Sequence, residues 1–118
     1  MRETRRKALE MLDKYNISTT LVCVIQKGVN DSEIPALIEY ATGWKCVRGI
    51  VFQPIQDVGR NSSSSDDYRI TLSEVREKII QAESNPFSAD DMIPLPCDPH
   101  KICVGYALKS KENIYPVT

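Results

Sequence analysis

The chain has few of the residues on which common catalytic and nucleotide-binding motifs depend. It contains one histidine, 5 glycines and 4 cysteines in 118 residues. The turn at residues 27–31 has a single glycine, whereas a phosphate-binding loop needs several glycines and a lysine at fixed spacing. The lone histidine has no assigned nucleophile. The sequence therefore shows neither a phosphate loop nor a catalytic triad.

An excess of charge and a long apolar run are also missing. The chain has 15 basic and 16 acidic residues, with a formal net charge of -1, so nothing favours nucleic acid as a partner. Apolar stretches such as residues 20–25 are far shorter than the ~20 residues of a membrane span. The charged N-terminus lacks the apolar core of a signal peptide. We expect a soluble, cytoplasmic protein without a membrane span.

The cysteines, at positions 23, 46, 97 and 103, form no CxxC pair. Disulfide frameworks are typical of smaller, more cysteine-rich secreted chains, so this pattern indicates a reducing compartment. Cys97, His100 and Cys103 follow at three-residue steps, a spacing compatible with zinc or an iron–sulfur cluster. They supply three of the four ligands of a closed zinc site. A proline-rich loop with incidental Cys and His is the alternative, and the stiff surroundings of Cys97 make it the best single candidate.

Hydrophobic periodicity predicts an α/β protein. Apolar residues at helical spacing predict helices over residues 4–16, 32–42 and 71–82, the last opened by a capping box at Thr71 and Glu74. Residues 18–26 and 46–54 are rich in β-branched residues and nearly continuously apolar, as parallel strands covered on both faces are. Pro35 belongs in the first turn of its helix, which favours Asp31 or Ser32 as the N-cap.

The order of these elements implies right-handed parallel crossovers. Residues 1–83 carry the βα-units, and residues 84–118 form a proline-rich C-terminal extension that we expect to be irregular, except for a short strand or helical turn at residues 104–108. A polar segment over residues 56–67 is expected to be a loop. Two strands make a poor parallel sheet, so the chain looks cut from a longer barrel or sheet. Missing segments or oligomerisation through the sheet edges would then cover those edges.

Candidate functional residues follow the two predicted strands. Sites in parallel α/β folds form at the carboxyl ends of strands. Alternation puts Gln26 and Gln53 on corresponding faces at these ends, where each could either line a site or simply leave the sheet into solvent. Asn30 is the residue of the intervening turn that capping does not explain. We therefore take Asn30, Gln53 and Gln26 as candidate binding residues.

An ordered set of segments resembles the C-terminal half of radical S-adenosylmethionine (radical SAM) enzymes. The set comprises residues 28–31 (GVND), 47–54 (VRGIVFQP), 59–60 (GR), 69–71 (RIT) and 93–97 (IPLPC). These segments occur in this order over about residues 5–109. The nearest branch includes tetraether lipid synthases and pterin-modifying methyltransferases. The resemblance implies a fragment of a partial (β/α)6 TIM-like barrel, with the two strands as the fifth and sixth.

The same resemblance implies a function for the parent enzyme. The family uses a [4Fe-4S] cluster to cleave S-adenosylmethionine reductively, and the cofactor carries the difficult chemistry. Asn30 and Gln53 would then line the S-adenosylmethionine and substrate cavity. Cys97 would lie near the active-site mouth, as a candidate metal ligand of an auxiliary cluster. The N-terminal half of the barrel would be the partner of this chain.

The sequence also departs from the family pattern. The cluster-binding CxxxCxxC motif is absent, as is the family's glycine-rich segment. We therefore expect this fragment to bind neither cofactor and to be inactive alone. Two other interpretations stay open: a non-catalytic α/β interaction module that uses its open sheet edges, and a small metal-binding module built on Cys97, His100 and Cys103.

Overall fold

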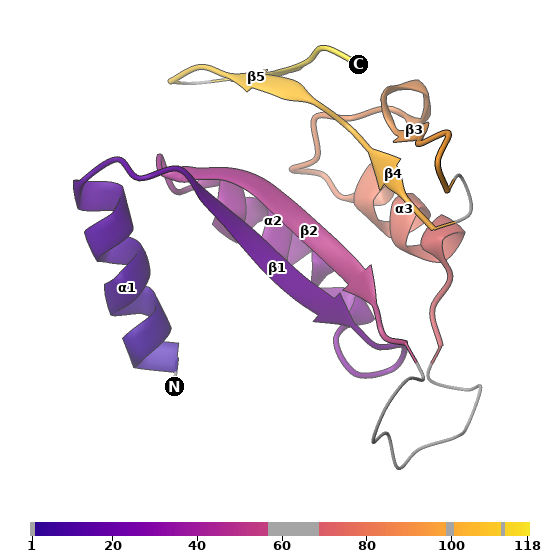
Figure 1. Ribbon diagram of the computed structural model, residues 1–118, viewed down its shortest axis with the longest axis horizontal. Helices are drawn as coiled ribbons and strands as arrows, with labels where there is room; N and C mark the ends of the chain where they lie inside the picture. The colour runs from indigo at the N-terminus through magenta and orange to yellow at the C-terminus, as the bar shows by residue number, and fades with distance from the viewer. Residues whose placement is uncertain (1, 57–68, 99–100, 112) are drawn as a thin grey trace.

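A computed structural model describes residues 2–56, 69–98, 101–111 and 113–118. The chain begins with three helices that alternate with two strands (Figure 1). This confirms the predicted order, with boundaries that differ by at most two residues. The elements are α1 (Arg2–Lys14), β1 (Thr19–Ile25), α2 (Ile34–Thr42), β2 (Val47–Pro54) and α3 (Leu72–Gln81).

The two main strands lie side by side and run parallel. The register pairs Thr20 with Gly49, Val22 with Val51 and Ile25 with Pro54. Pro54 ends β2, where its missing N–H costs no bond to β1, because the Ile55 N–H donates to the Ile25 carbonyl instead (2.9 Å). The carboxyl ends of β1 and β2 therefore meet at one edge, as predicted.

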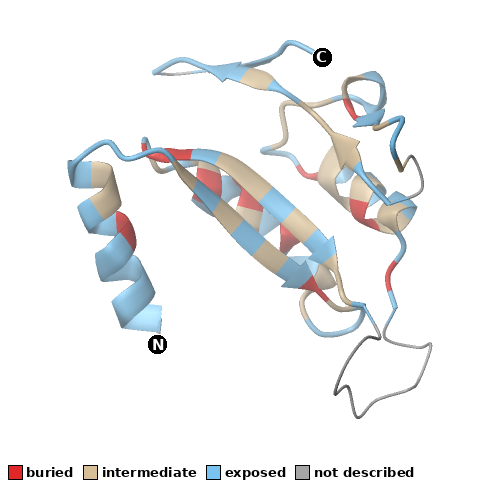
Figure 2. Cartoon of the chain, viewed as in Figure 1, coloured by how far each residue is buried: buried red, intermediate tan, exposed pale blue. Residues whose placement is uncertain are grey.

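The two faces of this sheet have different surroundings. Along β1 the exposure of side chains alternates, and Figure 2 shows the alternation as bands on both strands. The covered face turns toward α2 and α3, whose side chains pack against Cys23, Ile25 and Phe52. The opposite face is bare, with Val22 60% and Val24 52% exposed. Alternation predicts these residues, but it puts Arg48 rather than Val47 on the covered face. In the structure Val47 is buried and Arg48 is exposed, because the register shifts at the start of the pairing. A parallel sheet is normally covered on both faces, so this bare face is unusual.

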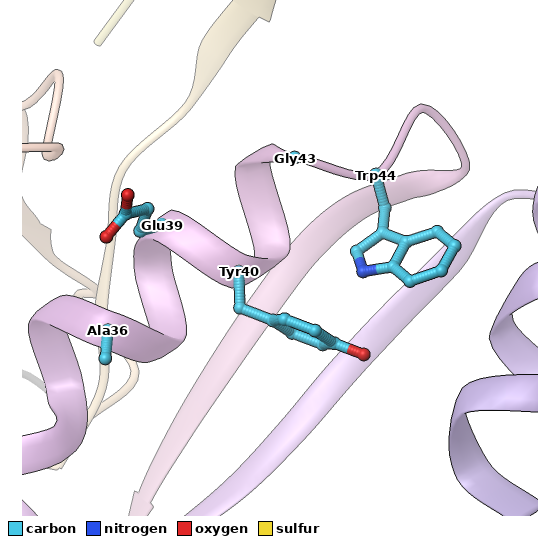
Figure 3. Close-up of a pocket in the computed structure, with 5 residues that line it drawn as sticks. All are labelled: Ala36, Glu39, Tyr40, Gly43 and Trp44. Atoms are coloured by element: carbon cyan, nitrogen blue, oxygen red, sulfur yellow. The ribbon is translucent and has the colours of Figure 1, made fainter. Parts of the chain in front are cut away.

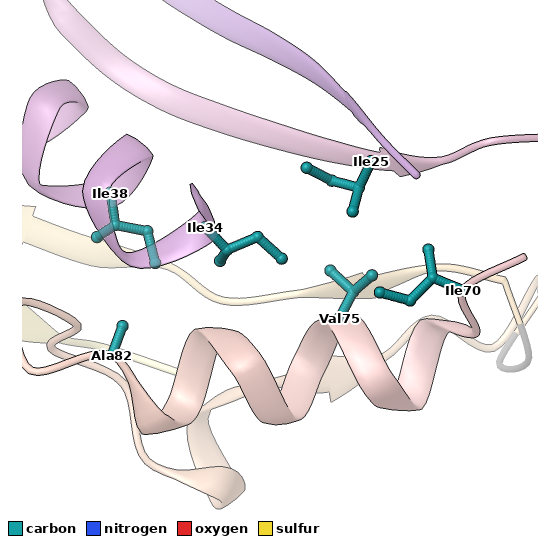
Figure 4. Close-up of a cluster of buried hydrophobic side chains, with 6 residues drawn as sticks. All are labelled: Ile25, Ile34, Ile38, Ile70, Val75 and Ala82. Carbon is teal, nitrogen blue, oxygen red and sulfur yellow. The ribbon is translucent and has the colours of Figure 1, made fainter. Parts of the chain in front are cut away.

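The main core lies between the covered face and the helices α2 and α3. Figure 4 shows its six buried side chains converging from β1, α2, α3 and the segment before α3. These residues are Ile25, Ile34, Ile38, Ile70, Val75 and Ala82. A second cluster joins Leu9 of α1 to Ala41 of α2 and to Cys46 and Val47. Both clusters lie on the helix side of the sheet.

The helix ends show where local sequence signals decide structure. The chain leaves α1 through Asn16, which has a positive φ of 53°, a conformation that asparagine tolerates at the end of a helix. The capping box of α3 is present, with Thr71 and Glu74 bonded to each other's backbone N–H groups. Pro35 lies in the first turn of α2, as predicted. The predicted N-cap is wrong, because α2 is entered through a 3-10 turn (Asp31–Glu33) and the Asp31 carboxylate bonds the Gly28 N–H instead.

The C-terminal segment is not the irregular tail that we expected. A 3-10 turn (Ala89–Asp91) precedes β3 (Ile93–Pro94), which pairs antiparallel with β4 (Cys103–Val104). Then β5 (Ala107–Lys109) and β6 (Ile114–Pro116) form a second antiparallel pair. These strands have two or three residues, too few for period-two alternation to appear in sequence, and they depend on cross-strand contacts.

Lys109 ties this C-terminal segment to α2. Its Nζ donates to the carbonyls of Thr42 and Trp44, each at 2.7 Å, at the end of α2. A cation at a helix C-terminus satisfies carbonyls that have no partner within the helix. The C-terminal segment is therefore held at that end of the α2 helix.

Replacing Lys109 by methionine should lower the free energy of unfolding by about 0.3–1 kcal/mol, because the last carbonyls of α2 lose their donor. Urea unfolding followed by circular dichroism would measure the change. Lys111→Met, on an exposed residue two positions later, is the matched control and should stay within about 0.5 kcal/mol of the wild type. An equal loss in both variants would contradict the capping role.

The described residues form an α/β arrangement of three helices with short parallel and antiparallel sheets, and no barrel closes within them. Most of the predicted loop at residues 56–67 lies outside the described residues. In the part of the chain that is described, no helix has the length and apolarity needed to cross a membrane.

Candidate functional site

The candidate site is the edge at which β1 and β2 end. Val24 pairs with Gln53, and Ile25 pairs with Pro54, so the last residues of the two strands are neighbours. Gln53 is exposed on the bare face, and Gln26, one residue past β1, is half-buried. For neither side-chain amide does the structure show a hydrogen bond with another described residue. Gln26 and Gln53 can therefore offer both donors and acceptors to a ligand at this edge.

Asn30 has a structural role that the sequence did not reveal. Its Oδ1 accepts from the Gln26 N–H at 2.8 Å, and its Nδ2 donates to the Val24 carbonyl at 2.8 Å. Both bonds are made to the backbone of β1, so the amide closes the turn onto the strand that precedes it. Asn30 thus holds the backbone beside Gln26, and its principal hydrogen-bonding capacity is already used.

The rest of this turn is also held by its own side chains. Gly28 has a φ of 77°, which favours glycine, and its N–H donates to Asp31 Oδ1 at 2.9 Å. Two ion pairs connect the turn to α3: Lys27 with Glu74 at 2.9 Å and Asp31 with Lys78 at 3.4 Å. The polar groups of the turn therefore fix its shape against α3, which leaves Gln26 and Gln53 as the amides available at the edge.

The ion pair between Lys27 and Glu74 makes stability depend on pH. The hydrogen bond from Lys27, together with those from Thr71, lowers the pKa of Glu74 from 4.5 to about 2. Because the folded pKa is below the unfolded value, this contribution is complete above pH 4.5 and is lost as the pH falls toward 2. Burial of the Asp31 carboxyl opposes the bonds from Gly28 and Lys78, which nevertheless leave its pKa lowered, so Asp31 adds to the same loss.

The urea midpoint of the wild type should therefore fall between pH 6 and pH 3, and Glu74→Gln should show a smaller fall because it has lost one of the contributing carboxylates. Chemical unfolding at several pH values would measure both curves. Glu77→Gln changes an exposed carboxylate on the same helix and should retain the wild-type fall. Parallel curves for the wild type and Glu74→Gln would show that the ion pair does not stabilise the fold.

Residues 97–103, which contain the candidate metal ligands, follow more than 40 residues after Gln53 in the sequence. The structure describes only part of this segment. All four cysteines are free. Cys97 is exposed, in the turn between β3 and β4, and Cys103 begins β4. His100 lies outside the described residues. Among the residues that are described, no group of three or more His, Cys, Asp or Glu side chains could hold a metal ion.

A shallow hollow on α2 provides no alternative site. Tyr40 and Trp44 form one wall, with ring centroids 6.0 Å apart in an edge-to-face arrangement. Glu39 is the one carboxylate among the residues that line the hollow (Figure 3). The hollow contains none of the three candidate binding residues. Its lining consists of Ala36, Glu39, Tyr40, Gly43 and Trp44.

Comparison with known proteins gives one relevant similarity. The chain is 30% identical over 95 residues to the 7,8-dihydro-6-hydroxymethylpterin dimethyltransferase of Methanocaldococcus jannaschii. The similarity covers 78% of this chain and 19% of that enzyme, so the chain spans about a fifth of the length of this curated relative. No family model matches the chain. The similarity supports a loose relation to the radical SAM family and no finer assignment.

Proposed function

We propose that this chain forms part of a larger radical SAM-type enzyme barrel in the cytoplasm, to which it contributes two parallel strands. The bare apolar face of β1 and β2, which ends in Gln26 and Gln53, is the observation that carries the proposal. In a barrel this face would turn inward, where apolar residues are covered and the carboxyl ends of strands form the site. The similarity to a much longer dimethyltransferase supports this assignment.

The parent enzyme would use S-adenosylmethionine and a [4Fe-4S] cluster, which supply radical chemistry when bound. This chain does not fit the cluster, because it has no CxxxCxxC motif and Cys46 is buried while Cys23 faces the helices. The cluster would therefore be held by the N-terminal half of the barrel. This chain would contribute the amides of Gln26 and Gln53 to the lining of the cavity. Alone, the chain would be inactive.

The genomic sequence before the Met1 codon tests this proposal. We expect the reading frame to continue upstream and to encode a CxxxCxxC motif. An in-frame stop codon upstream, with no such motif between it and the Met1 codon, would refute the assignment to a radical SAM enzyme. This holds whatever the arrangement of β1 and β2.

A second candidate function is a non-catalytic interaction module. The exposed apolar side chains Val22, Val24 and Val51 on the bare face favour it, since a folded protein rarely leaves such a face uncovered. This function predicts a stable oligomer or complex that does not bind S-adenosylmethionine. Size-exclusion chromatography with light scattering would reveal the oligomer, and a strict monomer would count against it.

Cys97 remains a candidate metal ligand within this proposal. Its exposure leaves the thiol accessible to a cluster or to zinc shared with other ligands. Metal analysis of the chain purified without a histidine tag tests the case in which this chain alone forms the site. Less than about one metal ion per chain would refute a zinc site held by one chain.

A further inference from the structure

The outer edge of β1 is the side of the strand away from β2. Backbone groups of a strand point alternately to its two neighbours. The Thr19 N–H and the Ile25 carbonyl are bonded to the β2 side of the sheet, to Cys46 and Ile55 respectively, each at 2.9 Å. The groups of the even-numbered residues of β1 therefore point to the outer edge, and among the described strands none pairs with that edge.

Asn30 occupies the last position on this edge. In a parallel ladder, a residue opposite position i donates to the carbonyl of i-1 and accepts from the N–H of i+1. The Asn30 amide makes these two bonds around Ile25, to the Val24 carbonyl and the Gln26 N–H. Its side chain thus imitates one residue of a neighbouring parallel strand. An antiparallel neighbour would instead exchange both bonds with a single residue.

The position of α1 also indicates that a strand belongs at the outer edge of β1. Leu9 of α1 packs on Ala41 and Val47, on the helix side of the sheet. Figure 1 shows α1 on the opposite side of β1 from β2, so helix extends past the β1 edge where the sheet stops. A helix that enters a parallel strand from this side is the usual crossover from a neighbouring parallel strand. The curated relative is long enough to contain further strands.

We propose that the outer edge of β1 is the docking edge for one more parallel strand of a larger sheet, and that Asn30 sets where this strand stops pairing. The added strand would bond to the carbonyls of Thr20 and Val22 and to the N–H groups of Val22 and Val24, with its last paired residue opposite Cys23. The position opposite Ile25 is already taken by Asn30. This inference rests on the part of the proposed function that puts the chain in a larger sheet, and it does not depend on radical chemistry.

Amide hydrogen exchange of the 118-residue chain, measured by NMR, tests the free edge. We expect the N–H groups of Val22 and Val24 to exchange rapidly, whereas those of Cys23, Ile25 and Gln26 exchange slowly. In Asn30→Ala, exchange at Gln26 should become at least about tenfold faster, with Cys23 and Ile25 little changed. If Val22 and Val24 are as slow as Cys23 in the monomeric wild type, the edge is not open and the proposal fails.

A synthetic peptide with the sequence of residues 18–26, with serine in place of Cys23, serves as the probe strand. We expect the peptide to pair parallel and in register, as identical segments do in many cross-β assemblies. Its residues opposite Leu21 and Cys23 then accept from the N–H groups of Val22 and Val24 and donate to the carbonyls of Thr20 and Val22. Excess peptide should slow exchange at Val22 and Val24 by at least about tenfold in the wild type, and at Gln26 as well in Asn30→Ala. The control peptide has proline at the positions opposite Leu21 and Cys23, which removes those donors.

The possible outcomes separate this inference from the proposed function. Equal effects of the two peptides, or no slowing at Val22 and Val24, would overturn the docking edge. Slowing with the probe peptide alone would support it even if no CxxxCxxC motif is found upstream, in which case only the radical SAM assignment would fall.

Discussion

Replacing Ile25 by alanine is expected to lower the free energy of unfolding by about 2–5 kcal/mol, the range measured for large-to-alanine changes in cores. The side chain is fully buried and packs with residues of α2 and α3. A loss of this size is comparable to the whole stability of many small domains. Thermal and urea unfolding should therefore show a variant that is largely unfolded or unfolds at much lower denaturant concentration.

Val24, the neighbouring residue on the same strand, is the matched control. It lies on the bare face and is 52% exposed. Val24→Ala should change the free energy of unfolding by no more than about 0.5 kcal/mol, as exposed substitutions do. A large loss in Val24→Ala would show that the bare face is covered in solution, and a small loss in Ile25→Ala would contradict the assignment of the core.

Asn30→Ala is expected to lower the free energy of unfolding by about 1–3 kcal/mol, because two hydrogen bonds, each contributing about 0.5–1.5 kcal/mol, are lost together. The Gln26 N–H and the Val24 carbonyl lose their partner. Urea unfolding measures this loss.

Two further variants distinguish the two bonds of Asn30 from a general effect of the turn. Asn30→Asp keeps an acceptor for the Gln26 N–H but turns a carboxylate oxygen toward the Val24 carbonyl, which repels it, so this variant should also be destabilised. Ser32→Ala, at an exposed position in the same turn, should be nearly neutral. A neutral Asn30→Ala would refute the role of Asn30 in closing the turn.

Sequence patterns predicted the main elements because those elements depend on short-range signals. The apolar character of β1 and β2, the helical spacing in α2 and the capping box of α3 are all readable over a few residues. Alternation also predicted which side chains of β1 face the helices, but it was wrong for Val47 and Arg48 of β2, where the register of the pairing shifts. The barrel stays a prediction, because no barrel closes within the described residues.

What sequence reasoning missed depends on contacts between side chains and backbone in three dimensions. Asn30 was singled out as unexplained, yet its bonds to β1 follow from the path of the turn through Gly28, which has a positive φ. The glycine itself is the one signal of this turn that the sequence contains. Asp31 was expected to cap α2, but the Gly28 N–H competes for its carboxylate. The pair of Lys27 and Glu74 joins residues 47 positions apart, beyond any local pattern.

Nuclear Overhauser contacts between β1 and β2 would establish whether these strands run parallel and end together. Contacts of Thr20 with Gly49, Val22 with Val51 and Val24 with Gln53 are expected. Contacts of Thr20 with Gln53 and of Val24 with Gly49 would instead reveal antiparallel strands, and the shared edge with Gln26 and Gln53 would not exist.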